Sequence, residues 1–303
     1  MTASGLMLFD TASVYFRAFF GVPSTLRSPD GRPVNAVRGL LDYLARFITD
    51  YSPASLVCCW DDSWRPQWRV DLLASYKAHR VATGDAEEIP ADLLAQVPMI
   101  REILAVIGIP VIGATGFEAD DVIASFAAHN TDVDVVTGDR DLFQVVDDSR
   151  RVRVLYLGRG AGKHDRVDAS WLRQRYGVSP DQYVDFAVLR GDPSDGLPGV
   201  PGIGEKTAAV LLASHGDLEG IVAAAGAGTL SPRVTASVLG AAEYLPAARA
   251  VVTAATDVAV ELVDRRLPSQ PRDPGRFQEL RQQWGLGGSA ERLLAALAQP
   301  RRT

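Results

Sequence analysis

Acidic residues follow several apolar segments of this sequence, at the positions where strands would end. Four such residues follow three predicted strands: Asp10 after residues 6–9, Asp61 after residues 56–60, and Asp139 and Asp141 after residues 133–136. The carboxyl ends of parallel strands meet at one edge of an open sheet, so these side chains would lie together. Helix N-capping is the commoner explanation for any single Asp. Four acids from three strands favour a shared site.

Two short motifs contribute five more carboxylates: Glu118, Asp120 and Asp121 after Gly116, and Asp192 and Asp195 in an Asp-Pro-Ser-Asp-Gly run. Each motif alone has a structural explanation, because acids in a first helical turn favour the helix dipole and Asp, Pro, Ser and Gly are turn residues. Nine gathered carboxylates, however, would repel one another unless cations neutralised them. Oxygen ligands without nearby His or Cys favour Mg²⁺ or Mn²⁺.

The elements that must position these acids alternate between strand and helix. Strands are predicted at residues 6–9, 56–60, 109–112, 133–136 and 152–156, with helices at residues 12–20, about 36–51 and 119–130. This pattern predicts an α/β fold with a mostly parallel central sheet and helices on both faces. We expect three parts: a core at residues 1–165 with a helical insertion at about 62–107, a helical subdomain at 166–265 and a C-terminal helical extension at 266–303.

Composition and charge narrow the class of protein. The chain has 303 residues, 47% hydrophobic, and no apolar run approaches the roughly 20 residues that span a bilayer, so we expect a cytoplasmic protein with no membrane partner. Adjacent Cys58 and Cys59 in an apolar run are expected to be buried. The net charge of −6 is by itself unfavourable for DNA binding. The nine acids, however, together carry more negative charge than this net value. Bound cations could therefore make the local field favourable to phosphate.

A glycine-rich turn and a basic pair suggest contacts with phosphate. Gly202 and Gly204 lie in a Pro-Gly-Ile-Gly turn before an apolar helix that carries Lys206, which suits a phosphate at bare N–H groups; ordinary turn chemistry is the alternative. Lys77 and Arg80 would share one face if residues 77–80 were helical, and a solvated charged face is the alternative there.

Taken together, these motifs resemble the bacterial 5′ nucleases, meaning the 5′–3′ exonuclease domain of DNA polymerase I and the related flap endonucleases. The resemblance covers roughly residues 5 to 265 and is carried by six segments: Leu8 to Asp10, Trp60 to Arg80, Gly116 to Asp121, Thr137 to Asp141, Gly191 to Asp195 and Gly199 to Lys206. It implies a PIN-like nuclease core, a helical arch formed by the insertion, and a helix-hairpin-helix motif in the helical subdomain.

The resemblance also implies roles for individual residues. Asp10, Asp61, Glu118 and Asp120 would serve one cation and Asp139, Asp141, Asp192 and Asp195 a second, with Asp121 left as a shared ligand, an outer contact or a ligand of a third ion. Lys77 would contact the scissile phosphate beside Arg80, and Arg17, Tyr76, Gly202, Gly204 and Lys206 would contact DNA. A K⁺ ion at the carbonyls around Gly202 is implied by resemblance alone.

The resemblance thus predicts a divalent-metal-dependent 5′–3′ exonuclease or flap endonuclease of DNA replication and repair. Its substrate would be DNA with a 5′ end, a flap or a single-strand/duplex junction. No polymerase domain follows residue 303, so we expect a monomer that acts alone. Gly196 stands where the family often has Asn, which puts the arch geometry in doubt but not hydrolysis. A carboxylate nuclease acting on RNA and a catalytically inactive DNA-binding relative are the alternatives.

Overall fold

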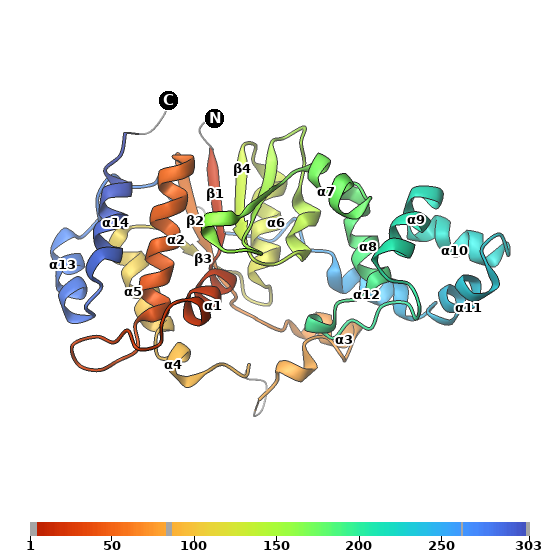
Figure 1. The fold of residues 1–303 in the computed structure, drawn as a ribbon, viewed down its shortest axis with the longest axis horizontal. Helices are drawn as coiled ribbons and strands as arrows, with labels where there is room; N and C mark the ends of the chain where they lie inside the picture. The colour runs from red at the N-terminus through yellow and green to blue at the C-terminus, as the bar shows by residue number, and fades with distance from the viewer. Residues whose placement is uncertain (1–4, 83–86, 262, 301–303) are drawn as a thin grey trace.

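The computed structural model describes residues 5–82, 87–261 and 263–300. Its centre is a six-stranded sheet in the order β3-β2-β1-β4-β5-β6 (Figure 1). The strands are β1 (Leu6–Asp10), β2 (Ser55–Cys59), β3 (Val111–Ile112), β4 (Val133–Thr137), β5 (Val152–Tyr156) and β6 (Asp165–Val167). All neighbours pair in parallel except β6, which is antiparallel to β5. The prediction of a mostly parallel α/β sheet is confirmed. Strand β6 was not predicted, because three residues are too few to show the alternation of side chains that is typical of a strand.

Both faces of the sheet are covered by helices, as expected. In β1, Leu6 and Leu8 belong to one buried cluster with α6 (Ala119–His129), whereas Met7 and Phe9 belong to a second buried cluster. This alternation arises because successive side chains of a strand point to opposite faces. The second cluster includes helices α2 (Asn35–Tyr51), α5 (Val97–Ile107), α13 (Pro274–Gln283) and α14 (Gly287–Leu297). Helix α1 (Thr11–Gly21) begins directly where β1 ends.

The helical subdomain extends from one end of the sheet, opposite to α13 and α14 (Figure 1). It contains α7 (Ala169–Tyr176), α8 (Tyr183–Arg190), α9 (Glu205–His215), α10 (Leu218–Gly226), α11 (Pro232–Gly240) and α12 (Tyr244–Val252). Its apolar side chains join the buried cluster on the α6 face, so the subdomain is packed against the core. Among the described helices none is alone long and apolar enough to cross a membrane; α9 and α10 pass that test only as a pair, and a bend of 85° separates them.

The helical insertion is shorter in the structure than its sequence pattern indicates. Helix α3 (Gln67–Leu72), the 3₁₀ turn η1 (Ala78–Arg80) and α4 (Ala91–Leu94) form the described part that lies away from the sheet (Figure 1). In contrast, α5 packs in the core, with Ile100, Ile103 and Leu104 fully buried. The helical pattern of residues 62 to 107 therefore covers two different parts of the fold. The pattern could not separate them, because periodicity does not show what a helix packs against.

The remaining short helices are 3₁₀ turns near strand or helix ends: η2 (Asp141–Val145), η3 (Ala161–Lys163), η4 (Pro180–Gln182) and η5 (Pro193–Asp195). The segment from Val258 to Glu261 and from Val263 to Pro268 forms no named strand in the described residues. The chain instead makes a single antiparallel bridge there, between Ser55 and Arg266, supported by the Leu56 amide, which donates to the Arg265 carbonyl (2.9 Å).

Candidate active site

The ends of three neighbouring strands bring the predicted acids together. Asp10 is the last residue of β1 and lies in register with Cys59 of β2, which is followed by Trp60 and then by Asp61. Asp10 also caps α1, since it accepts a hydrogen bond from the Ser13 amide (3.2 Å), and it accepts another from the Thr137 hydroxyl at the end of β4 (2.6 Å). Capping and membership of the acidic site are therefore compatible, although the sequence presented them as alternatives.

These strand ends face a cleft of about 1190 Å³. Five of the nine predicted acids line it: Asp10, Asp61, Glu118, Asp120 and Asp139. Lys77, Arg80 and Arg17 line the same cleft, together with aromatic side chains that include Phe16, Trp64 and Phe20, of which Phe20 is 72% exposed. The cleft therefore combines a negative floor with cationic and aromatic walls.

The other acids lie next to this cleft. Asp120, Asp141 and Asp195 line a small adjoining cavity, and Asp192 begins the turn that carries Asp195. Asp192 accepts from the Ser194 amide (2.9 Å), whereas the Asp141 Oδ1 atom is buried and has no hydrogen-bond partner in the described part of the chain. In the conformation described, no three acidic, His or Cys side chains of residues 5–82, 87–261 and 263–300 converge around a point that could hold an ion.

Burial and the charge of neighbouring acids raise the pKa of several of these carboxylates. Burial raises the pKa of Asp10 to about 7, and the charge of Asp61 adds to this shift. Burial likewise raises the pKa of Asp195 to about 6, partly offset by Lys77. The pKa values of Asp120 and Asp141 are raised by burial and then by the charge of Asp139. Nearby positive charge would relieve this cost.

Basic side chains from the insertion supply part of that charge. Lys77 forms an ion pair with Glu118, and Arg80 forms one with Asp195 (2.7 Å). Burial alone would lower the pKa of Lys77, but Glu118 raises it well above its ordinary value. The prediction that these residues share a helical face was wrong: Lys77 has a left-handed backbone (φ 48°), and Arg80 ends a 3₁₀ turn. They reach the acids because the Lys77 amide donates to the Asp195 carbonyl (2.9 Å).

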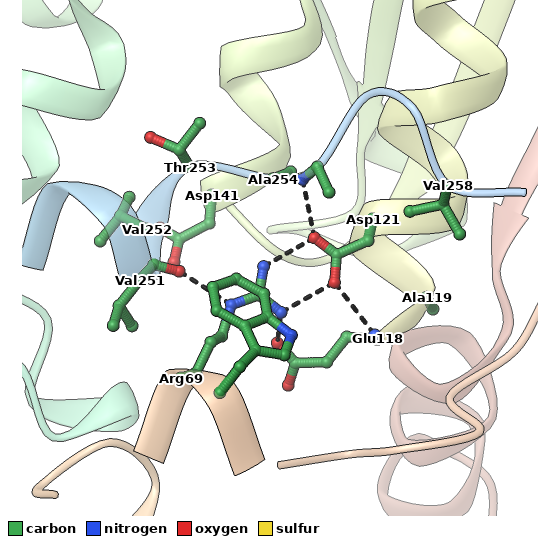
Figure 2. Close-up of polar contacts among 12 residues, drawn as sticks. Arg69, Glu118, Ala119, Asp121, Asp141, Val251, Val252, Thr253, Ala254 and Val258 are labelled. Carbon is green, nitrogen blue, oxygen red and sulfur yellow. Dashed lines mark hydrogen bonds and ion pairs between the residues drawn. The ribbon is translucent and has the colours of Figure 1, made fainter. Parts of the chain in front are cut away.

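The carboxylate of Asp121 is surrounded by donors from the protein (Figure 2), and unlike Glu118, which shares Arg69 with it, Asp121 does not line the cleft. It is fully buried and accepts from both terminal nitrogens of Arg69 (2.7 and 2.8 Å). The Glu118 and Ala255 amides also donate to it (3.1 and 2.8 Å). Asp121 is thus an anchor in this structure. Of the roles left open for it, these contacts favour an outer contact and argue against a direct metal ligand.

Two predicted DNA contacts have internal partners instead. The Tyr76 ring is buried, and its hydroxyl donates to Glu118 Oε2 (2.7 Å), so it offers no exposed surface to a base. The Arg17 guanidinium donates to the carbonyls of Gly138 and Leu157 (3.0 and 3.1 Å), which tethers α1 to the loops after β4 and β5. Arg17 still lines the cleft, but its contacts in the structure are with the protein itself.

The glycine-rich turn connects α8 to α9 and is open to solvent. Gly202 has φ +79°, a conformation that favours glycine, whereas Gly204 caps α9 in an extended conformation with open space around it. Gly202, Gly204 and Lys206 are all exposed. A phosphate could therefore approach the N-terminus of α9, which is the geometry that the sequence predicted.

Sequence reasoning did not assign roles to two buried arginines, Arg69 and Arg190. Arg190 lies 3.5 Å from Asp192, and neither of its terminal nitrogens has a hydrogen-bond partner among the residues that the structure describes. Their positions in the sequence could have indicated a role. Arg69 follows Trp68 inside one of the six segments that carry the family resemblance, and Arg190 directly precedes Gly191 and Asp192. Buried arginines are rare without a charged partner, so a basic residue in such a motif indicates an acid nearby.

This sheet with acids at its strand ends, together with a glycine-rich turn in the helical subdomain, agrees with the 5′ nuclease class. Two family models match the chain: the 5′-3′ exonuclease N-terminal resolvase-like domain over residues 5–177, and the 5′-3′ exonuclease C-terminal SAM fold over residues 178–274. The chain therefore belongs to the 5′-3′ exonuclease family, as the sequence predicted, and is a nuclease.

Individual relatives agree with this assignment. A 5′-3′ exonuclease of Streptomyces coelicolor is 54% identical over 299 residues, covering 96% of this chain and 99% of that protein. A 5′-3′ exonuclease of Mycobacterium tuberculosis is 50% identical over 311 residues, covering 97% of this chain and 98% of that protein. A solved structure of T5 5′-exonuclease with bound zinc is 16% identical, covers 97% of this chain and 99% of its own, and has a TM-score of 0.64. It confirms the fold.

Proposed function

We propose that this nuclease hydrolyses DNA phosphodiesters at 5′ ends, 5′ flaps and single-strand/duplex junctions, using two or more Mg²⁺ or Mn²⁺ ions. The observation that supports this most directly is the cleft of about 1190 Å³, which is lined by five acids together with Lys77 and Arg80. The acids alone would suit cations. Cationic side chains in the same cleft suit a substrate that carries its own negative charge.

The side chains present fit divalent cations. All predicted ligands are carboxylate oxygens, which Mg²⁺ and Mn²⁺ prefer. Asp141 Oδ1 is buried without a hydrogen-bond partner among the described residues, and burial raises the pKa values of Asp10 and Asp195, a cost that bound cations would relieve. Two ligand sets would hold the ions: Asp10, Asp61, Glu118 and Asp120 for the first, and Asp139, Asp141, Asp192 and Asp195 for the second.

When bound, such ions activate a water and neutralise charge on the attacking and leaving oxygens. The chain's own residues would place the DNA. Lys77 and Arg80, which now pair with Glu118 and Asp195, would turn toward the scissile phosphate once cations neutralise those acids. The exposed ring of Phe20 is available to an unpaired base on the cleft wall. Gly202, Gly204 and Lys206 would hold a phosphate of the duplex at the N-terminus of α9.

The division into a core, an arch and a helix-hairpin-helix subdomain suits this substrate, because a free 5′ end and its duplex need separate surfaces. In this proposal the single strand meets the insertion and the duplex meets the helical subdomain. A monomer carries both surfaces, so we propose that one chain suffices. A K⁺ ion near Gly202 remains a prediction of the family resemblance.

The test is cleavage of DNA that carries a label at the 3′ end of the flap strand. We expect cleavage near the junction with Mg²⁺ or Mn²⁺ and none with excess chelator. The same duplex without a flap, and a flap made of RNA, serve as comparison substrates. DNA binding without any metal-dependent cleavage would establish an inactive DNA-binding relative, and cleavage restricted to RNA would establish the ribonuclease alternative.

A further inference from the structure

Arg69 of α3 lies at a junction of three parts of the fold (Figure 2). Its side chain is 3% exposed, and its contacts use all three guanidinium nitrogens. Nε donates to the carbonyl of Val251 in α12 (2.9 Å), Nη2 donates to Asp121 (2.7 Å), and Nη1 donates to Glu118 (2.6 Å) and again to Asp121 (2.8 Å). One planar group therefore joins the insertion, the start of α6 and the helical subdomain.

Arg69 also determines how Glu118 is presented. Glu118 Oε2 accepts from Arg69 and from the Tyr76 hydroxyl (2.6 and 2.7 Å). The other oxygen, Oε1, pairs with Lys77, and both residues line the cleft. With Oε2 fixed from behind by two donors, rotation of the carboxylate is prevented and Oε1 is left on the cleft side.

The same contacts place the insertion relative to the cleft. Trp68, next to Arg69, donates its indole N–H to the Gly116 carbonyl (3.2 Å), and the Arg69 guanidinium lies 4.4 Å from the Trp68 ring. Asp121 accepts from the Ala255 amide just after α12, so the carboxylate that holds Arg69 also holds the helical subdomain. A change at this junction would move the segment carrying Tyr76 and Lys77 relative to α6.

We propose that Arg69 is a positioning residue for cleavage, which holds Glu118 and the base of the insertion in place through simultaneous hydrogen bonds to Glu118, Asp121 and Val251. This inference rests on the proposed function, in which Glu118 holds a cation and Lys77 faces the scissile phosphate. A lysine cannot replace Arg69, because a single ammonium lacks the planar fork that reaches two carboxylates and a carbonyl at once.

The experiment compares Arg69→Lys, Arg69→Met and the double variant Arg69→Met/Asp121→Asn on flap DNA. Each variant would be characterised by kcat, KM, urea unfolding and titration with Mn²⁺. Arg69→Met leaves Asp121 as a buried charge without its partner, so this variant is expected to unfold more easily. The double variant removes both charges and should recover stability, so its kinetics report on the positioning of Glu118 separately from folding.

We expect kcat to fall about 10- to 100-fold in all three variants and Mn²⁺ binding to weaken about tenfold, with little change in KM. Arg153→Lys is the matched control, because Arg153 forms an ion pair with the buried Asp134, which lies away from the carboxyl ends of the strands where the acids gather. Its kcat should equal that of the wild type.

Wild-type kcat and Mn²⁺ binding in the stable double variant, or in Arg69→Lys, would overturn the proposal and leave Arg69 with a role in stability alone. That result is distinguishable from failure of the proposed function. If the wild-type protein itself does not cleave flap DNA, the function is wrong; if it cleaves and the Arg69 variants cleave equally well, only the positioning role is wrong.

Discussion

Replacing Asp10 by Asn should make the metal-free protein more stable at alkaline pH, although the same change should stop cleavage. Burial raises the pKa of Asp10 from 3.8 to about 7. This shift means that the folded protein binds the proton more tightly than the unfolded chain. The associated stability is therefore present at low pH and is lost as the pH rises from about 4 to about 7.

The size of the effect follows from the shift and from the contacts of Asp10. A change from 3.8 to about 7 corresponds to about 4 kcal/mol of unfolding free energy that the charged carboxylate costs at about pH 8. Asn keeps an oxygen for the Ser13 amide but loses the acceptor for the Thr137 hydroxyl, worth about 1 kcal/mol. The net gain for Asp10→Asn is about 3 kcal/mol.

Urea unfolding in chelator, at several pH values, measures this gain. The advantage of the variant should shrink as the pH is lowered and disappear between about pH 5 and about pH 4, where the wild-type carboxyl is mostly protonated in the folded state and increasingly so in the unfolded chain. Adding Mg²⁺ at about pH 8 should stabilise the wild type more than the variant, since a ligand that binds only the folded state stabilises it. A variant that is less stable than the wild type at about pH 8 in chelator would refute the reasoning, because Asp10 would then be held charged by favourable partners.

Three further perturbations address the second ligand set, the hairpin and the insertion. Asp192→Asn should reduce cleavage by at least about 100-fold while the Kd for flap DNA, measured by fluorescence anisotropy, changes little; loss of folding by circular dichroism would instead mark Asp192 as structural. Lys206→Ala should weaken DNA binding and lower the slope of log Kd against log salt by about one, and an unchanged slope would remove Lys206 from the phosphate contacts. Gly196→Ala should displace the insertion and lower cleavage, because an added Cβ would lie 2.1 Å from the Ser75 carbonyl oxygen. Gly228→Ala is the control, since Gly228 has a similar φ (+68° against +73°) but open space around it. This variant should lose only about 1 kcal/mol of unfolding free energy in urea and should cleave like the wild type. Equal cleavage by both variants would show that the contact with Ser75 is unimportant.

The sheet was predicted because its buried strands are short apolar runs, three of which are followed closely by Asp. Parallel order follows from strands that alternate with helices, so the meeting of Asp10, Asp61 and Asp139 at one edge was foreseeable. The position of α5 was not foreseeable, because a helical pattern does not show whether its apolar face meets the sheet or a solvent-exposed arch. The same limit applied to Lys77, whose left-handed backbone depends on a tertiary hydrogen bond to Asp195.

Asp121 shows why residue type and motif are insufficient to separate ligands from anchors. Asp120 and Asp121 are adjacent in the first turn of α6, so their side chains point about 100° apart around the helix. Asp120 lines the cleft, whereas Asp121 meets Arg69 and the segment after α12. Asp121 is separated from Asp120 by its contacts with Arg69, 52 residues earlier in the chain, and with the Ala255 amide, 134 residues later, and neither contact can be read from the sequence around Asp121.

The difference between acids paired permanently within the protein and acids paired at the cleft also bears on how a chain with a negative net charge can bind DNA. Arg69 neutralises Asp121 permanently because the pair is buried and fully hydrogen bonded. Lys77 pairs with Glu118, and Arg80 pairs with Asp195, while both basic residues line a cleft, so under the proposed function cations would take their place. Each such exchange would free one positive side chain next to the scissile phosphate. A chain with a net charge of −6 can therefore present positive charge to DNA at the point of cleavage, provided that divalent cations are bound.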